Sequence, residues 1–251
     1  MAAPAPRILP QGECGLVVEL GEAIGDAVNA RVHALARAVR EELGDRVEEV
    51  VPGYRALLVI HDPLRTPRAG LVRRLRALAA RVPEQEAPPP PRVVRVPVRY
   101  GGAPGPDLEE AARLCGLSAG ELVARHTAPV YRVHMLGFTP GFPYLGGLDP
   151  RIAVPRLAAP RTRIPAGSVA IGGEQTGIYP VESPGGWRIL GRTPLRLFDP
   201  SPGAAHPFLL AAGDGLRFVP VDDAAYAEVE RAVAAGAFEP EQERPARGGA
   251  R

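Results

Sequence analysis

The stretch that decides the fold class runs from Ser168 to Leu190 and reads SVAIGGEQTGIYPVESPGGWRIL. It sets short apolar runs, Ser168–Ile171 and Trp187–Leu190, between turns that are rich in glycine and proline. Further along the chain, Leu195–Phe198 and Leu216–Val219 repeat this texture. Short strands that follow one another through tight turns predict a β-barrel or a β-sandwich.

The segments around this stretch complete one domain. The residues of Arg92–Val98 alternate as in a strand, and Val130–Leu136 has the composition of another. Asp107 with Glu110 and Ser118 with Glu121 have the spacing of helix-capping boxes, so two short helices are expected. A third helix is expected over Asp222–Ala235.

The first part of the chain has a different pattern. Cys14–Leu20 suits a strand, and apolar residues recur at helical spacing over Asp26–Leu43. Two β-rich runs, Val47–Val51 and Tyr54–Ile60, come next, and a second helical stripe covers Leu71–Val82. The order β-α-β-β-α predicts a small two-layer α+β unit.

The boundary between the two units is the segment PEQEAPPPP, Pro83–Pro91, because consecutive prolines form a semi-rigid spacer. The sequence therefore predicts an α+β domain at 1–82, a linker at 83–91, a β-barrel domain at 92–238 and a flexible tail at 239–251.

Composition excludes several classes of function. The 251 residues are 45% hydrophobic and carry a net charge of +2, and no basic stripe suggests nucleic acid. The chain contains no lysine, so it offers no P-loop, no Schiff base and no biotin attachment site. Neither Cys14 nor Cys115 lies in a metal-binding spacing, and no apolar run approaches the roughly 20 residues that span a bilayer. We expect a cytoplasmic protein that does not enter a membrane.

The densest motif is GFTPGFPYLGGL, Gly137–Leu148, with four glycines, two prolines and three aromatic rings. A loop of this kind presents backbone amides beside apolar rings, and we expect it to line one groove with Trp187, the single tryptophan. The alternative is a compact loop that packs on its own rings.

Polar candidates lie on the neighbouring segments. Arg156 and Arg161 each follow a proline, and a restrained guanidinium can hold an anion with two hydrogen bonds. The glycine-rich loops 172–177 and 183–187 offer backbone amides for the same purpose, although ordinary hairpin turns are the alternative. His134 is either a catalytic or a structural residue of its strand, and His126 flanks that strand. His33, His61 and His206 are expected at the surface.

The order of these motifs resembles a known family. GFTPGFPYLGGLDPRI and VPRLAAPRTRIPAGSVAIGGEQTGIYPVESPGGWRILGRTPLRLFDP are similar to the B subunit of bacterial 5-oxoprolinase, a family also described as allophanate hydrolase subunit 1 and as sporulation-kinase inhibitors. RILPQGECGLVVELGE and VVPGYRALLVIHDP resemble the N-terminal domain of that family, so the resemblance covers nearly the whole chain.

The resemblance implies a ferredoxin-like N-terminal domain and a cyclophilin-like β-barrel C-terminal domain. It also implies two partners: the related C subunit, and the A subunit that completes the ATP-dependent opening of the lactam 5-oxo-L-proline to L-glutamate. ATP would be shared with, or held by, those partners. Three other functions stay open: a non-catalytic regulator that binds a histidine kinase, an allophanate or urea-metabolism carboxyltransferase-type subunit, and a prolyl isomerase.

The resemblance also extends to single residues. Candidates for catalysis are Arg156, Arg161, His134 and Gln175. Candidates for binding substrate are Phe138, Pro140, Gly141, Phe142, Tyr144, Ser168, Thr176, Tyr179, Ser183, Gly185, Gly186, Trp187 and Arg192. No metal ligands are expected.

Overall fold

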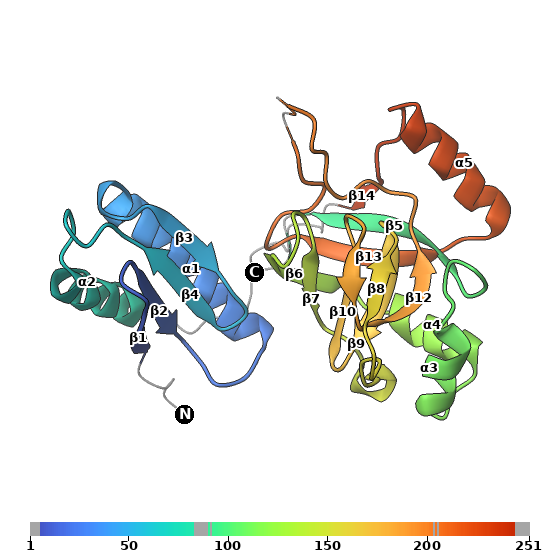
Figure 1. Cartoon of the computed structure of the whole chain (residues 1–251), viewed down its shortest axis with the longest axis horizontal. Coiled ribbons are helices and arrows are strands. Elements are labelled where there is room, and N and C mark those ends of the chain that lie inside the picture. Colours follow the sequence, from blue (N-terminus) through green and yellow to red (C-terminus); the bar gives the residue numbers. More distant parts are fainter. Residues whose placement is uncertain (1–5, 83–89, 91, 203, 205, 244–251) are drawn as a thin grey trace, which may run out of the picture. The chain divides into compact units, whose positions relative to one another are not determined.

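A computed structural model describes residues 6–82, 90, 92–202, 204 and 206–243 (Figure 1). The chain divides into two compact units, residues 1–89 and 90–251. The predicted linker, Pro83–Pro91, lies outside the described residues except for Pro90. The α+β class, with an antiparallel sheet and a closed barrel, is confirmed.

The first unit is a four-stranded antiparallel sheet that packs with two helices. The strand order is β1-β2-β4-β3. Leu16, Val32 and Leu75 represent the core that joins the sheet to both helices. The elements are β1 (Arg7–Gln11), β2 (Gly15–Glu19), α1 (Asp26–Leu43), the 3-10 helix η1 (Gly44–Arg46), β3 (Glu49–Pro52), β4 (Ala56–Ile60) and α2 (Arg68–Arg81).

Strand β1 is an addition to the predicted order. Its residues RILPQ are mostly exposed, and Ile8 alone among them is half-buried, so no alternating apolar pattern announces it. Pro10 lies within the strand, as is tolerated at a sheet edge. The strand forms because its backbone completes the ladder along β2.

The second unit is built on a closed barrel. Its sheet has the order β12-β9-β10-β7-β6-β13-β5-β14, and a further pairing of β12 with β5 closes seven of these strands into a ring. Strands β5 and β13 run parallel. The strands are β5 (Val93–Tyr100), β6 (Tyr131–Leu136), β7 (Pro143–Gly146), β9 (Ser168–Gly172), β10 (Gln175–Ile178), β12 (Arg188–Arg192), β13 (Gly215–Pro220) and β14 (Gln242–Glu243).

Three helices and a small ribbon accompany the barrel. The ribbon pairs β8 (Arg161–Ile164) with β11 (Ser183–Gly185). The helices are α3 (Leu108–Leu114), α4 (Ala119–Thr127) and α5 (Asp223–Ala234), and a 3-10 turn η2 covers Pro150–Ile152. None of the described helices is long and apolar enough to cross a membrane.

The structure of this unit differs from three local predictions. The capping box at Ser118 and Glu121 is confirmed, whereas Asp107 makes no side-chain cap and turns to other partners. Leu195–Phe198 is not a strand, and Phe198 forms only an isolated bridge with Phe208. The tail does not begin at 239, because Gln242–Glu243 pairs with β5; residues 244–251 lie outside the description.

Candidate functional site

A groove of about 300 Å³ opens in the second unit beside the barrel. The predicted groove is confirmed, because one rim comes from the Gly137–Leu148 loop and Trp187 lies in the same lining. The residues that line it are Phe138, Phe142, Tyr144, Arg156, Pro160, Tyr179, Pro184, Gly185, Gly186 and Trp187.

The loop holds Phe138 at the rim in a strained conformation. Phe138 has a φ of 64°, and it is the one non-glycine residue with positive φ in the part of the chain that the structure describes. Phe138 is 62% exposed, and its ring meets Phe142 edge-on at 5.7 Å between centroids. Backbone hydrogen bonds from Gly137 to Phe142 and from Phe142 to Thr139 fix the loop. Strain of this kind is concentrated at functional sites.

Aromatic rings form the floor of the groove. Phe142 is buried and lies 5.1 Å from Tyr144, 5.3 Å from Tyr179 and 5.5 Å from Trp187, measured between ring centroids. A Cβ on Gly172 would come within 2.4 Å of Trp187 Cδ1, so glycine at this position is what lets the indole ring lie on the barrel. The position of Trp187 in the floor of the groove therefore depends on the glycine at position 172.

Arg156 provides the positive charge of the groove. Its guanidinium lies 5.7 Å from the centroid of Trp187, and its Nη2 is 3.5 Å from Gln175 Oε1. Among the described residues it forms no ion pair with a carboxylate. Burial raises the pKa of Tyr144, and the charge of Arg156 opposes this effect. Arg156 is therefore available to an anionic group from outside the chain.

Arg161, a predicted anion ligand, does not line the groove and instead forms an ion pair within the chain. Its Nη1 and Nη2 donate to the two carboxylate oxygens of Asp107, at 2.8 and 2.7 Å. Asp107 is 5% exposed, and it also accepts a hydrogen bond from the backbone nitrogen of Ile189 at 2.7 Å. Both terminal nitrogens of the Arg161 guanidinium therefore bind a carboxylate within the chain.

Two other candidates from the sequence are held inside the barrel wall. Ser168 is buried, and its hydroxyl donates to the carbonyl of Pro165 at 2.8 Å. Thr176 is fully buried and donates to the carbonyl of Ala170 at 3.0 Å. Their side chains therefore do not line the groove.

Four further candidates lie outside the lining. Arg192 donates from Nε to the carbonyl of Ala166 at 2.9 Å. His134 is 1% exposed, and a Cβ on Gly146 would come within 2.2 Å of its ring, so the histidine is packed into the wall. Pro140 is exposed, and Gly141 (φ 81°) packs against Phe198.

The structure thus brings together eight of the candidates and adds two residues that the sequence analysis missed. Two other candidates are next to the groove without lining it. Gln175 contacts Arg156, and Ser183 precedes Pro184 on β11. Pro160 and Pro184 were not singled out, although each flanks a motif that was. The signal that could have found them is their position, because Pro160 directly precedes Arg161 and Pro184 directly precedes Gly185 and Gly186.

His126 forms a polar cluster inside the barrel that the sequence did not reveal. Its Nδ1 lies 2.8 Å from the hydroxyl of Tyr100, and its Nε2 lies 2.9 Å from Thr176 Oγ1. Its ring stacks on Phe218 at 4.5 Å. Burial lowers the pKa of His126 to about 3, so the ring is neutral at physiological pH and its role is structural.

His61 and the two cysteines are further side chains of the types that bind metal ions or take part in catalysis. His61 is fully buried, which corrects its predicted surface position, and its Nδ1 lies 2.9 Å from the carbonyl of Thr66. Cys14 and Cys115 are free thiols. The described residues contain no group of three or more histidine, cysteine or acidic side chains placed to hold a metal ion.

Comparison with known sequences agrees with the resemblance. The family model for the carboxyltransferase domain, subdomains C and D, matches residues 6–210. The 5-oxoprolinase B subunit of Bacillus subtilis is 41% identical over 229 residues, which cover 86% of this chain and 92% of that protein. The protein of the same name from Escherichia coli O157:H7 is 44% identical, and the match covers 83% of this chain and 93% of that protein.

Solved structures show the same fold. TTHA0988 is 41% identical with a TM-score of 0.71; the match covers 83% of this chain and 40% of that longer chain. PH0987 from Pyrococcus horikoshii is 44% identical with a TM-score of 0.51, over 88% of this chain and 100% of that one. The K. lactis urea amidolyase, at 21% identity and a TM-score of 0.81, shares the fold over 95% of this chain and 16% of that one. The chain therefore belongs to the carboxyltransferase-domain family, subdomains C and D, together with the 5-oxoprolinase B subunits that it resembles at 40–44% identity.

Proposed function

We propose that this chain is the B subunit of a cytoplasmic, ATP-dependent 5-oxoprolinase and that the Trp187 groove binds the lactam. One observation carries the proposal: flat aromatic walls and one guanidinium, which has no carboxylate partner among the described residues, share a groove of about 300 Å³. This volume is at the lower end of ordinary ligand pockets. 5-Oxo-L-proline is a small, nearly flat ring with one carboxylate, and it matches both features.

In this arrangement Arg156 would hold the substrate carboxylate through a bidentate contact, and the lactam ring would lie against Phe142 and Trp187. The reaction breaks the ring C–N bond, adds the oxygen of water to the carbonyl carbon, and leaves the nitrogen as the amine of glutamate. Because a lactam is a stable amide, transfer of the terminal phosphoryl group of ATP to its oxygen, with release of ADP, would activate the carbonyl carbon toward water. Cleavage of the ring C–N bond would then leave an acyl phosphate, and a second water would release inorganic phosphate and glutamate. The contribution of this chain is to bind and orient the ring and to exclude water.

The groove does not fit ATP itself. Its lining offers one cationic side chain, Arg156, and the chain has no lysine to hold a triphosphate. We therefore propose that the A and C subunits hold the nucleotide and that no phosphoryl step rests on the groove residues of this chain. The same lack of lysine leaves no residue for biotin attachment.

The names of the relatives also support this proposal over the alternatives. Three curated relatives, each named as the B subunit of 5-oxoprolinase, are 40–44% identical over most of the chain. The kinase regulator, the carboxyltransferase-type subunit and the prolyl isomerase have no comparable support: the family name and the shared fold are compatible with several chemistries.

The test is reconstitution from purified proteins with 5-oxo-L-proline and ATP. We expect no turnover from this chain alone, turnover from its mixture with the C and A subunits, and loss of that turnover when this chain is omitted. Full ATP-dependent turnover by this chain alone, or unchanged turnover by its two partners without it, would contradict the proposal.

A further inference from the structure

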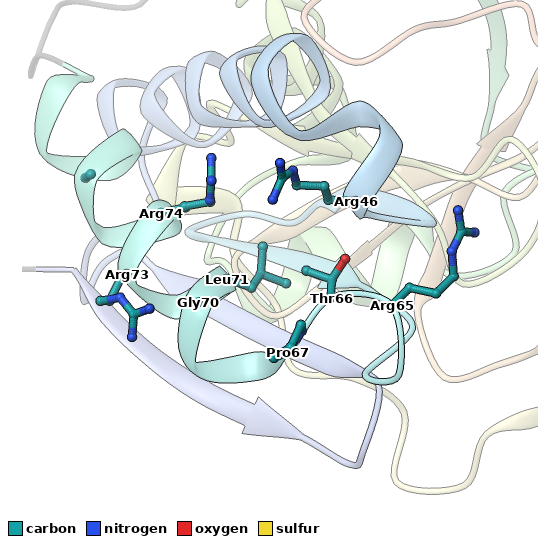
Figure 2. Close-up of a pocket in the computed structure, with 9 residues that line it drawn as sticks. Arg46, Arg65, Thr66, Pro67, Gly70, Leu71, Arg73 and Arg74 are labelled. Carbon is teal, nitrogen blue, oxygen red and sulfur yellow. The ribbon is translucent and has the colours of Figure 1, made fainter.

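The first unit contains a second hollow, of about 480 Å³, between the start of α2 and η1 (Figure 2). Four arginines border it: Arg46, Arg65, Arg73 and Arg74. In Figure 2, Arg46 and Arg74 extend toward one another over Thr66 and Leu71, and Arg65 and Arg73 lie at the two sides. No acidic side chain belongs to the lining.

These arginines differ from most others in the unit by what they contact. Residues 6–82 contain twelve arginines, and six of them bind a carbonyl or a carboxylate within the chain. Those six are Arg7, Arg31, Arg40, Arg55, Arg68 and Arg81. For the other six, the described residues provide no side-chain hydrogen bond or ion pair, and four of these six border the hollow. The remaining two are Arg37 and Arg76.

The backbone adds to the positive charge. Helix α2 has 14 residues, and Pro67 at its N-cap makes no side-chain capping bond. The first turn of α2 contains no acidic residue, and Thr66, Pro67 and Gly70 of that end line the hollow. A helix N-terminus carries partial positive charge and unused amide donors. Four cations beside it, with no acid among the lining residues, repel one another unless an anion lies between them.

We propose that this hollow binds a small, multiply charged phosphate anion. Guanidinium groups favour phosphate oxygens because they offer two parallel donors, and two facing arginines can hold two phosphate groups. The lining includes no aromatic ring, so the hollow would recognise phosphate and not a base. This site is independent of the lactam groove, which lies in the other unit.

The test is calorimetric titration of the full-length chain with inorganic tripolyphosphate at physiological salt, with inorganic phosphate as the comparison. We expect saturable binding of tripolyphosphate that is at least tenfold tighter than that of phosphate. The double variant Arg46→Gln with Arg74→Gln should weaken it at least tenfold. The matched double variant Arg37→Gln with Arg76→Gln removes the same charge elsewhere in the unit and should change the affinity less than twofold.

All four substituted side chains are exposed, and equal melting temperatures will show that the variants fold. If the Arg46→Gln, Arg74→Gln double variant does not fold, the double variant Arg46→Lys with Arg74→Lys replaces it. Lysine keeps the charge but lacks the planar bidentate geometry of arginine, so this variant should still weaken binding several-fold. An absence of saturable binding, or an equal loss in both double variants, would overturn the proposal. So would binding of an acidic peptide that depends on Arg46 and Arg74 when tripolyphosphate does not bind.

Discussion

Arg161 and Asp107 form a two-toothed ion pair although 54 residues separate them, with N–O distances of 2.7 and 2.8 Å. Asp107 also accepts the backbone nitrogen of Ile189, so one carboxylate ties the start of α3 to β8 and to β12. The ribbon formed by β8 and β11 supplies Gly185 to the groove. The ion pair therefore supports the site from outside it.

Asp107→Ala should lower the free energy of unfolding by roughly 3 kcal/mol, because it leaves the Ile189 amide and the Arg161 guanidinium without their acceptor. Urea unfolding of the purified chain measures this change. Arg37→Lys, at an exposed position on α1, is the control and should change stability by less than about 0.5 kcal/mol. A loss for Asp107→Ala as small as that of the control would show that the ion pair does not hold the ribbon.

Gly172→Ala tests the packing of the indole ring. The new methyl group would lie 2.4 Å from Trp187 Cδ1, so the ring must move, at a cost of about 1–3 kcal/mol. Trp187 is the only tryptophan, and its fluorescence reports the displacement directly. Gly120→Ala in α4 meets nothing within 4 Å and should be neutral or stabilising, by up to about 1 kcal/mol. An unchanged spectrum in Gly172→Ala would contradict this packing.

His126 should make the stability depend on pH. The unfolded state binds a proton below pH 6.5, whereas the folded state binds one only near the lowered pKa of about 3. Protonation therefore favours unfolding, and stability falls as pH decreases through this window, by up to about 1.4 kcal/mol per pH unit. His126→Phe cannot titrate. The free energy of unfolding of the wild type minus that of the variant should therefore decrease from pH 6.5 toward pH 4. Parallel urea curves at each pH measure it, and a constant difference would exclude this role.

The sequence predicted the elements whose patterns are local. The apolar stripe of α1 and the capping box of α4 each depend on residues a few positions apart, and both were found. The groove was found as well, because aromatic rings concentrated in a glycine-rich loop are a local signal. By contrast, β1 is an exposed edge strand that exists only because β2 offers a partner.

Contacts between distant residues could not be predicted in this way. Asp107 has the spacing of a helix cap, and only the barrel closure brings Arg161 and Ile189 to it. Thr176 belongs to a turn-like sequence, yet the fold turns its hydroxyl inward to His126. In both cases a tertiary partner outweighs the local preference of the residue.

Steady-state kinetics of the reconstituted enzyme with Arg156→Lys test the central claim most directly. Lysine keeps the charge over Trp187 but cannot form a planar two-toothed contact with a carboxylate. We predict that kcat/KM for 5-oxo-L-proline falls about thirtyfold to thousandfold, or roughly 2–4 kcal/mol, while Arg37→Lys and Arg161→Lys complexes that remain assembled keep most of their activity. Unchanged tryptophan fluorescence will show that Arg156→Lys preserves the groove. Equal kcat/KM values for Arg156→Lys and Arg37→Lys would remove Arg156 from the substrate site and contradict the account.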